Sequence, residues 1–345
     1  MTYKKPQKLK QGDTVAIVSP SWGGPSVFPH VYENGLKILS EWGLKIKEYP
    51  TARADAGFLS RDHRARAKDI NDAFADKEVK AIFASIGGDD SVRLLPFLDK
   101  KIIAENPKII MGYSDTTTLL VFGNLQGFIT LHGPAIMAGF SQIENLPEGF
   151  KSHVYEMLFE PKQSYEYKPY GEYCEGYLDW SKPENVGKIK ELKTDTGWRF
   201  LQGSGKIEGK LFGGCIEVLE FLKGTDFWPT NEFWSGKILF FETSEEKPPI
   251  DHVKWMLRNY GTQGIFEKVS AVIFGRARDY SPEEKDMLDK TIKSVVADEF
   301  EKPNLPIVTN MDFGHTDPQF ILPLGIKAEL DCQNKKFRLV ESWLE

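Results

Sequence analysis

Over residues 1–140 the chain alternates short apolar segments with longer amphipathic ones, and this alternation limits the folds that it can adopt. The apolar segments are strand-sized and rich in Val and Ile, which favours strands. The segments between them carry apolar residues at helical spacing. Strands that alternate with helices predict a doubly wound α/β fold, a parallel sheet with helices on both faces. The expected strands are 14–20, 44–50, 79–88, 107–114 and 128–134, and the expected helices are 29–42, 61–75, 90–99 and 115–126.

The pattern breaks at residues 160–206, which are rich in Tyr, Gly, Lys and Glu and have little apolar periodicity. We expect a long connection with extended pieces there, and such connections are more often functional than idle. Strands and helices then return. Residues 206–225 predict an extended segment, a Gly-Gly turn and a helix, and residues 326–342 predict a closing β-hairpin.

The length of 345 residues favours two domains that share one interface. We expect an N-terminal domain at residues 1–165, a connecting loop that contacts substrate at 166–206, and a second α/β domain at 207–345. Ligands of parallel sheets bind beyond the carboxyl ends of the strands, so the loops that follow the strands are the expected site.

Charge and cysteine content exclude several classes of partner. The net charge of −6 argues against nucleic acid or an anionic membrane, because both require a basic surface. Cys174, Cys215 and Cys332 are far apart and predict neither a disulfide framework nor a zinc site. Reduced thiols, together with an N-terminal segment that lacks the apolar core of a signal peptide, fit a cytoplasmic protein.

A serine stands where one expected strand gives way to a helix. Ser114 lies in the sequence Gly-Tyr-Ser-Asp, directly before the amphipathic segment 115–126. A serine on such a turn is exposed, and the helix N-terminus behind it favours developing negative charge, so Ser114 is a candidate nucleophile. The motif lacks the second glycine of the hydrolase elbow, and capping of the helix by Ser114 or Asp115 is the alternative.

Two adjacent glycines end the preceding expected strand, 79–88. Gly87 and Gly88 allow backbone N–H groups to face a ligand without obstruction by side chains. Such groups, together with the N–H of Asp115, are suited to stabilise an oxyanion. A tight turn without a ligand is the alternative. The chain has no GxxxxGK[ST] motif, which disfavours a phosphate-binding loop.

A serine nucleophile requires a base and an acid. His315 lies in a loop that follows an expected strand, and loops often carry function. Glu242 ends an apolar strand, where a carboxylate without a partner is costly. The order serine, acid, histidine is known from serine hydrolases, so Ser114, Glu242 and His315 form a candidate triad. His132, at the end of another expected strand, competes for the role of base.

The segments that carry these residues resemble the LD-carboxypeptidase family of serine peptidases, over nearly the whole chain. Within this family the chain looks closest to the microcin C immunity peptidases. The resemblance implies that Ser114 is the nucleophile, Glu242 the acid and His315 the base, with oxyanion donors in the N–H groups of Gly88 and Asp115. The segments are SIGGDDSVRLLP, GYSDTT, LHGP, LFGGCIEVLEFLKGT, FFETSEE and FGHTDPQ.

The resemblance also implies an architecture and an activity. The N-terminal domain would carry the serine, the C-terminal domain the acid and base, and the site would lie in the cleft between them, with a homodimer and no metal or cofactor. The enzyme would hydrolyse the amide of an aminoacyl-nucleotide of the microcin C type; the alternative is release of terminal D-alanine from cytoplasmic murein tetrapeptides. The long aromatic connection favours the first substrate. A non-catalytic binding protein is disfavoured, because it has no need of all three triad residues.

Five further residues are expected to contact the substrate. In the immunity branch the equivalent loop brings an aromatic ring over the nucleotide base; Trp180 is the expected counterpart and Trp198 the second choice, and packing of either ring onto the domain is the alternative. Lys247 would meet a carboxylate or phosphate, unless it is a solvated surface lysine. Cys215 stands where the family often has Asn, either altering a polar contact or acting as a small buried residue. Asp89 follows the paired glycines.

Overall fold

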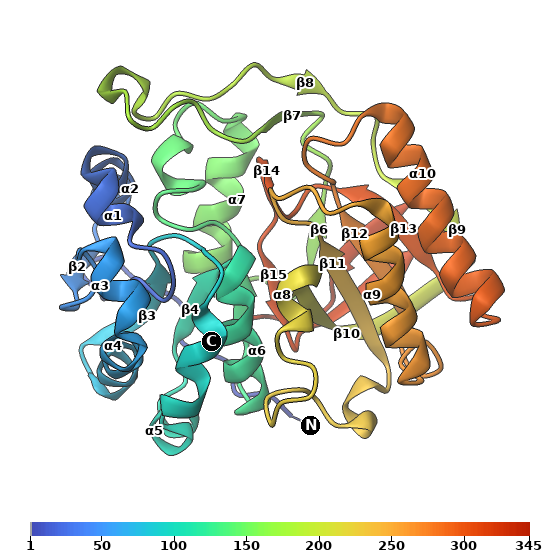
Figure 1. Cartoon of the computed structure of the whole chain (residues 1–345), viewed down its shortest axis with the longest axis horizontal. Helices are drawn as coiled ribbons and strands as arrows, with labels where there is room; N and C mark the ends of the chain where they lie inside the picture. Colours follow the sequence, from blue (N-terminus) through green and yellow to red (C-terminus); the bar gives the residue numbers. More distant parts are fainter. Residues whose placement is uncertain (1) are drawn as a thin grey trace.

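The computed structural model describes residues 2–345 and contains two large sheets, one built mainly from each half of the chain (Figure 1). The first has six strands in the order β15-β5-β4-β3-β1-β2, and neighbours among β1 to β5 are parallel. The doubly wound fold predicted from the alternating pattern is therefore confirmed. The strands are β1 (Thr14–Val18), β2 (Lys45–Glu48), β3 (Val79–Ala84), β4 (Ile109–Gly112) and β5 (Thr130–His132).

Three of the four expected helices of the first half are present as α-helices, namely α2 (Pro29–Glu41), α4 (His63–Ala75) and α6 (Thr117–Leu125). The expected helix at 90–99 is instead a 3₁₀ helix, η1 (Ser91–Phe97), which contains Pro96. Proline lacks an N–H and disrupts the hydrogen bonds of an α-helix, which explains this difference. The other helices of this half are α1 (Gly24–Val27), α3 (Ala56–Arg61), α5 (Lys100–Glu105), η2 (Ser114–Thr116), η3 (Phe140–Gln142) and α7 (Glu148–Phe159).

The second sheet has eight strands in the order β6-β17-β16-β10-β11-β12-β13-β9. Neighbours from β10 to β13 are parallel, and the expected closing hairpin is confirmed as the antiparallel pair β16 and β17. Its strands are β6 (Tyr165–Tyr167), β9 (Arg199–Gln202), β10 (Lys206–Cys215), β11 (Lys237–Glu242), β12 (Ala271–Gly275), β13 (Ile307–Met311), β16 (Lys327–Asp331) and β17 (Lys336–Leu339). Its helices are α8 (Ile216–Glu220), η5 (Asn231–Trp234), α9 (Ile250–Thr262), α10 (Pro282–Lys293) and η6 (Ser294–Glu299).

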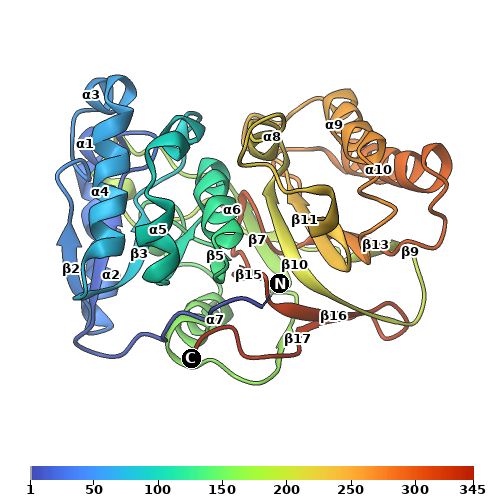
Figure 2. The ribbon, with the colours of Figure 1, turned by 90° about the horizontal axis from the view of Figure 1, so that it is seen from below.

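The paired glycines of the second half do not form the expected turn, because β10 continues through Gly213 and Gly214 to Cys215. A Cβ atom at Gly213 would lie 1.7 Å from the carbonyl oxygen of Phe240, and one at Gly214 would lie 2.4 Å from Thr117. These glycines therefore let β10 approach β11 on one side and the start of α6 on the other. Helices α6 and α8 meet at this boundary between the two halves (Figure 2).

The connection at 160–206 runs along one edge of both halves (Figure 1). It contains extended pieces, as expected, and η4 (Pro183–Asn185). Its strands β7 (Glu172–Glu175) and β8 (Lys193–Thr194) form a small sheet with β14 (Thr316–Asp317), while β6 and β9 join the second sheet.

One strand of the second half lies in the first sheet. β15 (Leu322–Leu324) pairs antiparallel with β5, so backbone hydrogen bonds connect the two halves close to the carboxyl end of β4. Among residues 2–345 no helix combines the length and apolar character that a membrane span requires.

Candidate active site

Ser114 lies at the turn between β4 and α6 and has a φ of 57°. This left-handed conformation is uncommon for a residue with a side chain, and its cost is typical of functional turns. A Cβ atom at Gly87 would lie 3.0 Å from Oγ of Ser114 and 3.5 Å from the backbone nitrogen of Asp115. The glycine thus keeps open the space that faces both the hydroxyl and this N–H group.

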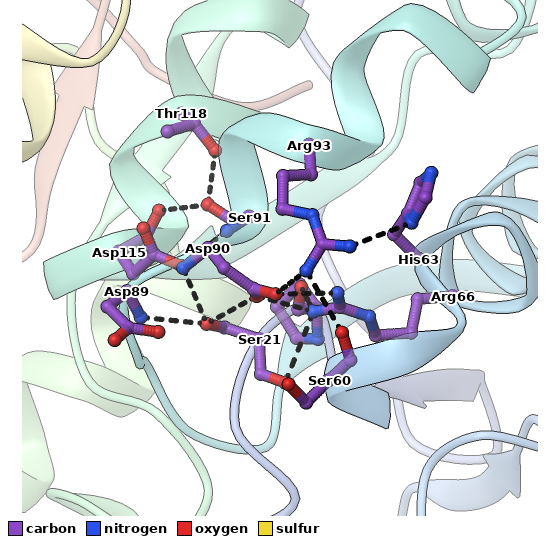
Figure 3. A network of polar contacts seen from close by, with 11 residues as sticks. Ser21, Ser60, His63, Arg66, Asp89, Asp90, Ser91, Arg93, Asp115 and Thr118 are labelled. Carbon is purple, nitrogen blue, oxygen red and sulfur yellow. Dashed lines mark hydrogen bonds and ion pairs between the residues drawn. The ribbon is translucent and has the colours of Figure 1, made fainter. Parts of the chain in front are cut away.

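The turn that carries Gly87 and Gly88 is held by a polar network (Figure 3). Gly88 has a φ of 149°, and Oγ of Ser21 accepts a hydrogen bond from the backbone nitrogen of Asp89 at 3.0 Å. The guanidinium of Arg66 is buried and donates to both carboxylate oxygens of Asp90, at 2.7 and 2.9 Å. Such bidentate pairs fix geometry as well as contribute energy, so the network fixes the backbone beside Ser114.

The residue after Ser114 joins the same network through its own buried carboxylate. Oδ2 of Asp115 accepts a hydrogen bond from the backbone nitrogen of Ser91 at 2.8 Å, and Oγ of Ser91 donates to the carbonyl oxygen of Asp115 at 2.7 Å (Figure 3). Burial raises the pKa of the Asp115 carboxyl. The two loops that precede η1 and α6 are therefore tied together behind the serine.

His315 and Glu242 form a buried pair across the second half of the chain. Nδ1 of His315 lies 2.6 Å from Oε2 of Glu242, the last residue of β11. His132 is also close, with Nε2 at 3.7 Å from Oε1 of Glu242, which is too long for a direct hydrogen bond. His132 is fully buried and does not line the pocket described below, whereas His315 does.

The pair is electrostatically coupled. Burial by itself would raise the pKa of Glu242, but the neighbouring charge of His315 lowers it to about 2. Burial by itself would lower the pKa of His315, but the charge of Glu242 and their hydrogen bond raise it above its usual value of 6.5. The arrangement stabilises a carboxylate beside a histidine that can accept a proton.

Ser114 and His315 line one pocket of about 470 Å³. Gly88 lies in its wall, and so does Trp180 from the connection, so segments from both halves of the chain and the connection meet there. Further residues in its wall include Phe28, Tyr177, Glu245 and Arg278. Residues 2–345 contain no cluster of three or more His, Cys, Asp or Glu side chains with the geometry of a metal site.

Trp180 is positioned by contacts of both its backbone and its ring. Its carbonyl oxygen accepts a hydrogen bond from Nε2 of His30 at 2.7 Å, and its ring lies 5.8 Å from that of Phe28. Its ring also lies 5.0 Å from that of Tyr177, whose hydroxyl donates to Asp317 at 3.0 Å. The tryptophan therefore packs onto the first half and also lines the pocket.

The remaining expected substrate residues do not line this pocket. Trp198 donates from Nε1 to Oδ2 of Asp312 at 2.7 Å and packs in the second half. Nζ of Lys247 lies 2.8 Å from Glu284. Cys215 is fully buried, with its backbone nitrogen bonded to Thr117, and the side chain of Asp89 is exposed.

Sequence reasoning missed several polar residues that line the pocket, among them Tyr177, Glu245 and Arg278. Arg278 stands three residues after β12, at the carboxyl end of the second sheet, which is the expected place for ligand contacts. Its neighbour Arg276 is instead buried, with Nη2 bonded to Asp195 and Asp312 at 2.9 and 2.7 Å. The pattern Arg-Ala-Arg does not by itself reveal which of the two faces the site.

A serine and a histidine that line one pocket, with a buried carboxylate bonded to the histidine, are typical of serine hydrolases. Comparison with known proteins gives the family. Residues 15–133 match the LD-carboxypeptidase N-terminal domain and residues 208–330 match the LD-carboxypeptidase C-terminal domain. The chain belongs to the LD-carboxypeptidase family of serine peptidases.

Relatives within the family carry names that point to different functions. A carboxypeptidase-like protein of Vibrio cholerae is 30% identical, over 100% of this chain and 99% of its own length. The microcin C7 self-immunity protein MccF of Escherichia coli is 29% identical, over 97% of this chain and 95% of its own length. A Bacillus subtilis protein named for murein peptide carboxypeptidase activity is 26% identical, over 96% of this chain and 92% of its own length.

Solved structures of relatives share the two-domain architecture. MccF in complex with aspartyl sulfamoyl adenosine superposes with a TM-score of 0.87 at 29% identity, over 99% of this chain and 100% of that chain. An MccF-like protein of Streptococcus pneumoniae in complex with AMP superposes with a TM-score of 0.84 at 29% identity, over 95% of this chain and 99% of that chain. The resemblance to the microcin C immunity peptidases is therefore confirmed in both sequence and overall structure.

Proposed function

We propose that this protein hydrolyses an amide bond through an acyl-enzyme, with Ser114 as nucleophile, His315 as base and Glu242 as the acid that orients His315. One observation carries the proposal: Ser114, in its strained turn, lines the same pocket as His315, which Glu242 holds at 2.6 Å. The hydrogen bond between Nδ1 of His315 and Glu242 leaves Nε2 to exchange a proton with the serine.

In the first step, Nε2 of His315 accepts the proton of Ser114 as Oγ attacks the amide carbonyl. The imidazolium that forms is stabilised by the buried carboxylate of Glu242. It then donates its proton to the leaving nitrogen, the C–N bond breaks and an ester remains on Oγ. Water, activated by the same imidazole, hydrolyses the ester and regenerates the serine.

The tetrahedral intermediate needs donors for its oxyanion. We assign this role to the backbone N–H groups of Gly88 and Asp115. The Cβ position of Gly87 lies close to both Oγ of Ser114 and the nitrogen of Asp115, so an oxygen can approach them there. Donors fixed in advance by the network of Figure 3 need no reorganisation during the reaction.

For the substrate we propose an aminoacyl-nucleotide of the microcin C type, whose hydrolysis would protect the cell. Trp180 supports this choice, because an aromatic ring at the pocket can stack on a nucleotide base. The relatives of known structure include MccF bound to aspartyl sulfamoyl adenosine, which adds support from similarity. The alternative substrate is a murein tetrapeptide with terminal D-alanine, and the Bacillus subtilis relative supports it.

Direct competition between the two substrates tests the proposal. The protein is incubated with aspartyl sulfamoyl adenosine and with the murein tetrapeptide at equal concentrations, and the release of aspartate and D-alanine is followed by mass spectrometry. We expect release of aspartate at the higher kcat/KM. Release of D-alanine alone would favour the role in wall recycling.

The proposal also assigns a task to each part of the chain. Residues 1–165 supply the nucleophile, residues 207–345 supply the acid and the base, and residues 166–206 contact the substrate. As the family resemblance implies, the enzyme would act as a homodimer in the cytoplasm, without a cofactor.

A further inference from the structure

The pocket contains an arginine that the proposed catalytic steps do not use. Nη1 of Arg278 donates to Oε2 of Glu245 at 3.3 Å, and its Nε donates to Asp279 at 3.1 Å. Its other terminal nitrogen, Nη2, has no hydrogen-bond partner among residues 2–345. Because a guanidinium presents several donors in one plane, Arg278 retains donor capacity for an anion.

The carboxylate of Glu245 lies between this arginine and the proposed base. The oxygen that contacts Nη1 of Arg278 also lies 3.6 Å from Nε2 of His315. The side chain of Glu245 is 54% exposed and that of Arg278 is 16% exposed, so the glutamate is the partner that can move away. A carboxylate at this place thus contacts both the guanidinium and the nitrogen that transfers the proton.

The same geometry suits an anionic group close to the scissile bond. Nε2 of His315 gives its proton to the leaving nitrogen in the proposed reaction. In a peptide with a free C-terminus, the terminal carboxylate is attached to the carbon next to that nitrogen. In an acyl phosphoramidate or acyl sulfamate, the phosphorus or sulfur is bonded to the nitrogen directly. In both kinds of substrate the central atom of the anionic group is therefore one or two bonds from the leaving nitrogen, which receives the proton from Nε2 of His315.

We propose that Arg278 binds the anionic group on the leaving side of the substrate and that the substrate displaces Glu245 from this position. The inference rests on the proposed function and extends it to a substrate class. That class comprises amides whose nitrogen carries, at one or two bonds, a carboxylate, phosphoramidate or sulfamate group. Charge-assisted hydrogen bonds from the guanidinium select such substrates over neutral amides.

Two matched pairs of substrates test the assignment. The first pair is the murein tetrapeptide with a free terminal carboxylate and the same peptide as its carboxamide. The second is aspartyl sulfamoyl adenosine and the neutral amide of aspartate with 5′-amino-5′-deoxyadenosine. For each pair, the ratio of kcat/KM for the anionic member to that for the neutral member is measured in wild type, Arg278→Gln and Arg278→Lys. Arg258→Gln is the control, because Arg258 pairs with Glu299 outside the pocket.

We expect a wild-type preference for the anionic member of about tenfold to a hundredfold, the range of hydrogen bonds to charged groups. Arg278→Gln should bring this ratio close to one, Arg278→Lys should retain part of it, and Arg258→Gln should keep all of it. Loss of preference in the peptide pair alone would assign the site to a terminal carboxylate. Loss in the nucleotide pair alone would assign it to a sulfamate or phosphoramidate.

Equal turnover of both members by the wild-type enzyme, or an unaltered ratio in Arg278→Gln, would overturn the assignment. Thermal melting of each variant shows whether it is folded. If the wild-type enzyme turns over none of the four compounds, the proposed function fails and not only the role of Arg278. Glu245→Gln adds an independent readout, since loss of the competing carboxylate should lower KM for the anionic members. A raised KM would contradict the displacement of Glu245.

Discussion

Nδ1 of His315 lies 2.6 Å from Oε2 of Glu242, although 73 positions of sequence separate the two residues. β11 ends at Glu242, and the loop after β13 delivers His315, so the parallel order of the second sheet brings them together. Both residues are buried, and their coupling determines the protonation of the proposed base.

This coupling predicts the pH dependence of turnover. The base must be neutral to accept a proton, and Glu242 raises the pKa of His315 above 6.5, with Glu245 and Glu217 acting in the same direction. We therefore expect kcat/KM to fall as the pH decreases through an inflection above 6.5. Measuring kcat/KM from about pH 5 to about pH 9 would locate this inflection, because the range extends roughly two pH units to either side of neutrality.

Replacement of the acid tests the origin of the inflection. In Glu242→Gln the charge that most strongly raises the pKa of His315 is lost, so burial, which lowers that pKa, is opposed only by the weaker effects of Glu245 and Glu217. The inflection should move to lower pH, and kcat should fall by about 10⁴-fold, as for loss of the acid in other triads. Glu246→Gln, at an exposed neighbouring position, should leave both unchanged. An inflection that stays in place in Glu242→Gln would argue against the pair.

Substitution of Gly87 tests the space in front of the nucleophile. A Cβ atom at this position would lie 2.9 Å from Cβ and 3.0 Å from Oγ of Ser114. We expect Gly87→Ala to lower kcat by about 10²- to 10³-fold, the size of effect seen when oxyanion contacts are lost, while the protein still folds. Gly149→Ala is the control, because its Cβ meets only Tyr170 at 3.6 Å. Equal activity of Gly87→Ala and Gly149→Ala would contradict the assignment of the oxyanion site to the space beside Gly87.

Removal of the Trp180 ring tests the nucleotide part of the proposal. If the ring stacks on the base, Trp180→Ala weakens binding of aspartyl sulfamoyl adenosine by about 1–3 kcal/mol. The murein tetrapeptide, which lacks a base, should be little affected. Calorimetry with a Ser114→Ala background prevents turnover during the titration. A comparable loss for both ligands would mean that Trp180 supports the loop through Phe28 and Tyr177 instead.

The network behind the serine makes a prediction about stability. Arg66→Ala removes a guanidinium whose side chain is 1% exposed and leaves Asp90 without its main partner. We expect a loss of about 3 kcal/mol in the free energy of unfolding, as for other broken buried pairs. Arg93→Ala is the matched control, because Arg93 pairs with the same carboxylate but is 44% exposed, and should cost less than about 1 kcal/mol. Urea denaturation would measure both, and similar losses would contradict the buried role of Arg66.

The sequence predicted individual strands and helices better than it predicted which strands pair with each other. Alternating apolar segments were sufficient for β1 to β5, because a buried parallel strand has a recognisable composition. Nothing in residues 322–324 indicates that β15 leaves its own half to pair with β5, since periodicity does not specify a distant strand. The Gly213-Gly214 pair was wrongly predicted as a turn, because close approach of β10 to Phe240 and Thr117 also requires glycine.

The candidate site shows the same limit. Ser114 stands on a strand-to-helix turn and His315 in a loop after a strand, so local pattern was sufficient to propose both. Arg278 was missed, because both arginines follow β12 and only the tertiary structure shows that Arg276 is buried against Asp195 and Asp312 while Arg278 lines the pocket. Trp198 was proposed on residue type alone, and its indole is instead bonded to Asp312, which only the tertiary structure reveals.

The most direct test of the account is the turnover of Ser114→Ala with whichever substrate the wild-type enzyme hydrolyses. Without the hydroxyl no acyl-enzyme can form, so we predict a fall in kcat of about 10⁶-fold, as for loss of a triad serine elsewhere, with substrate binding retained. Intact-mass spectra of the wild-type enzyme during turnover should also show an acyl adduct that the variant lacks. A Ser114→Ala enzyme that retains turnover within about tenfold of wild type would contradict the serine mechanism.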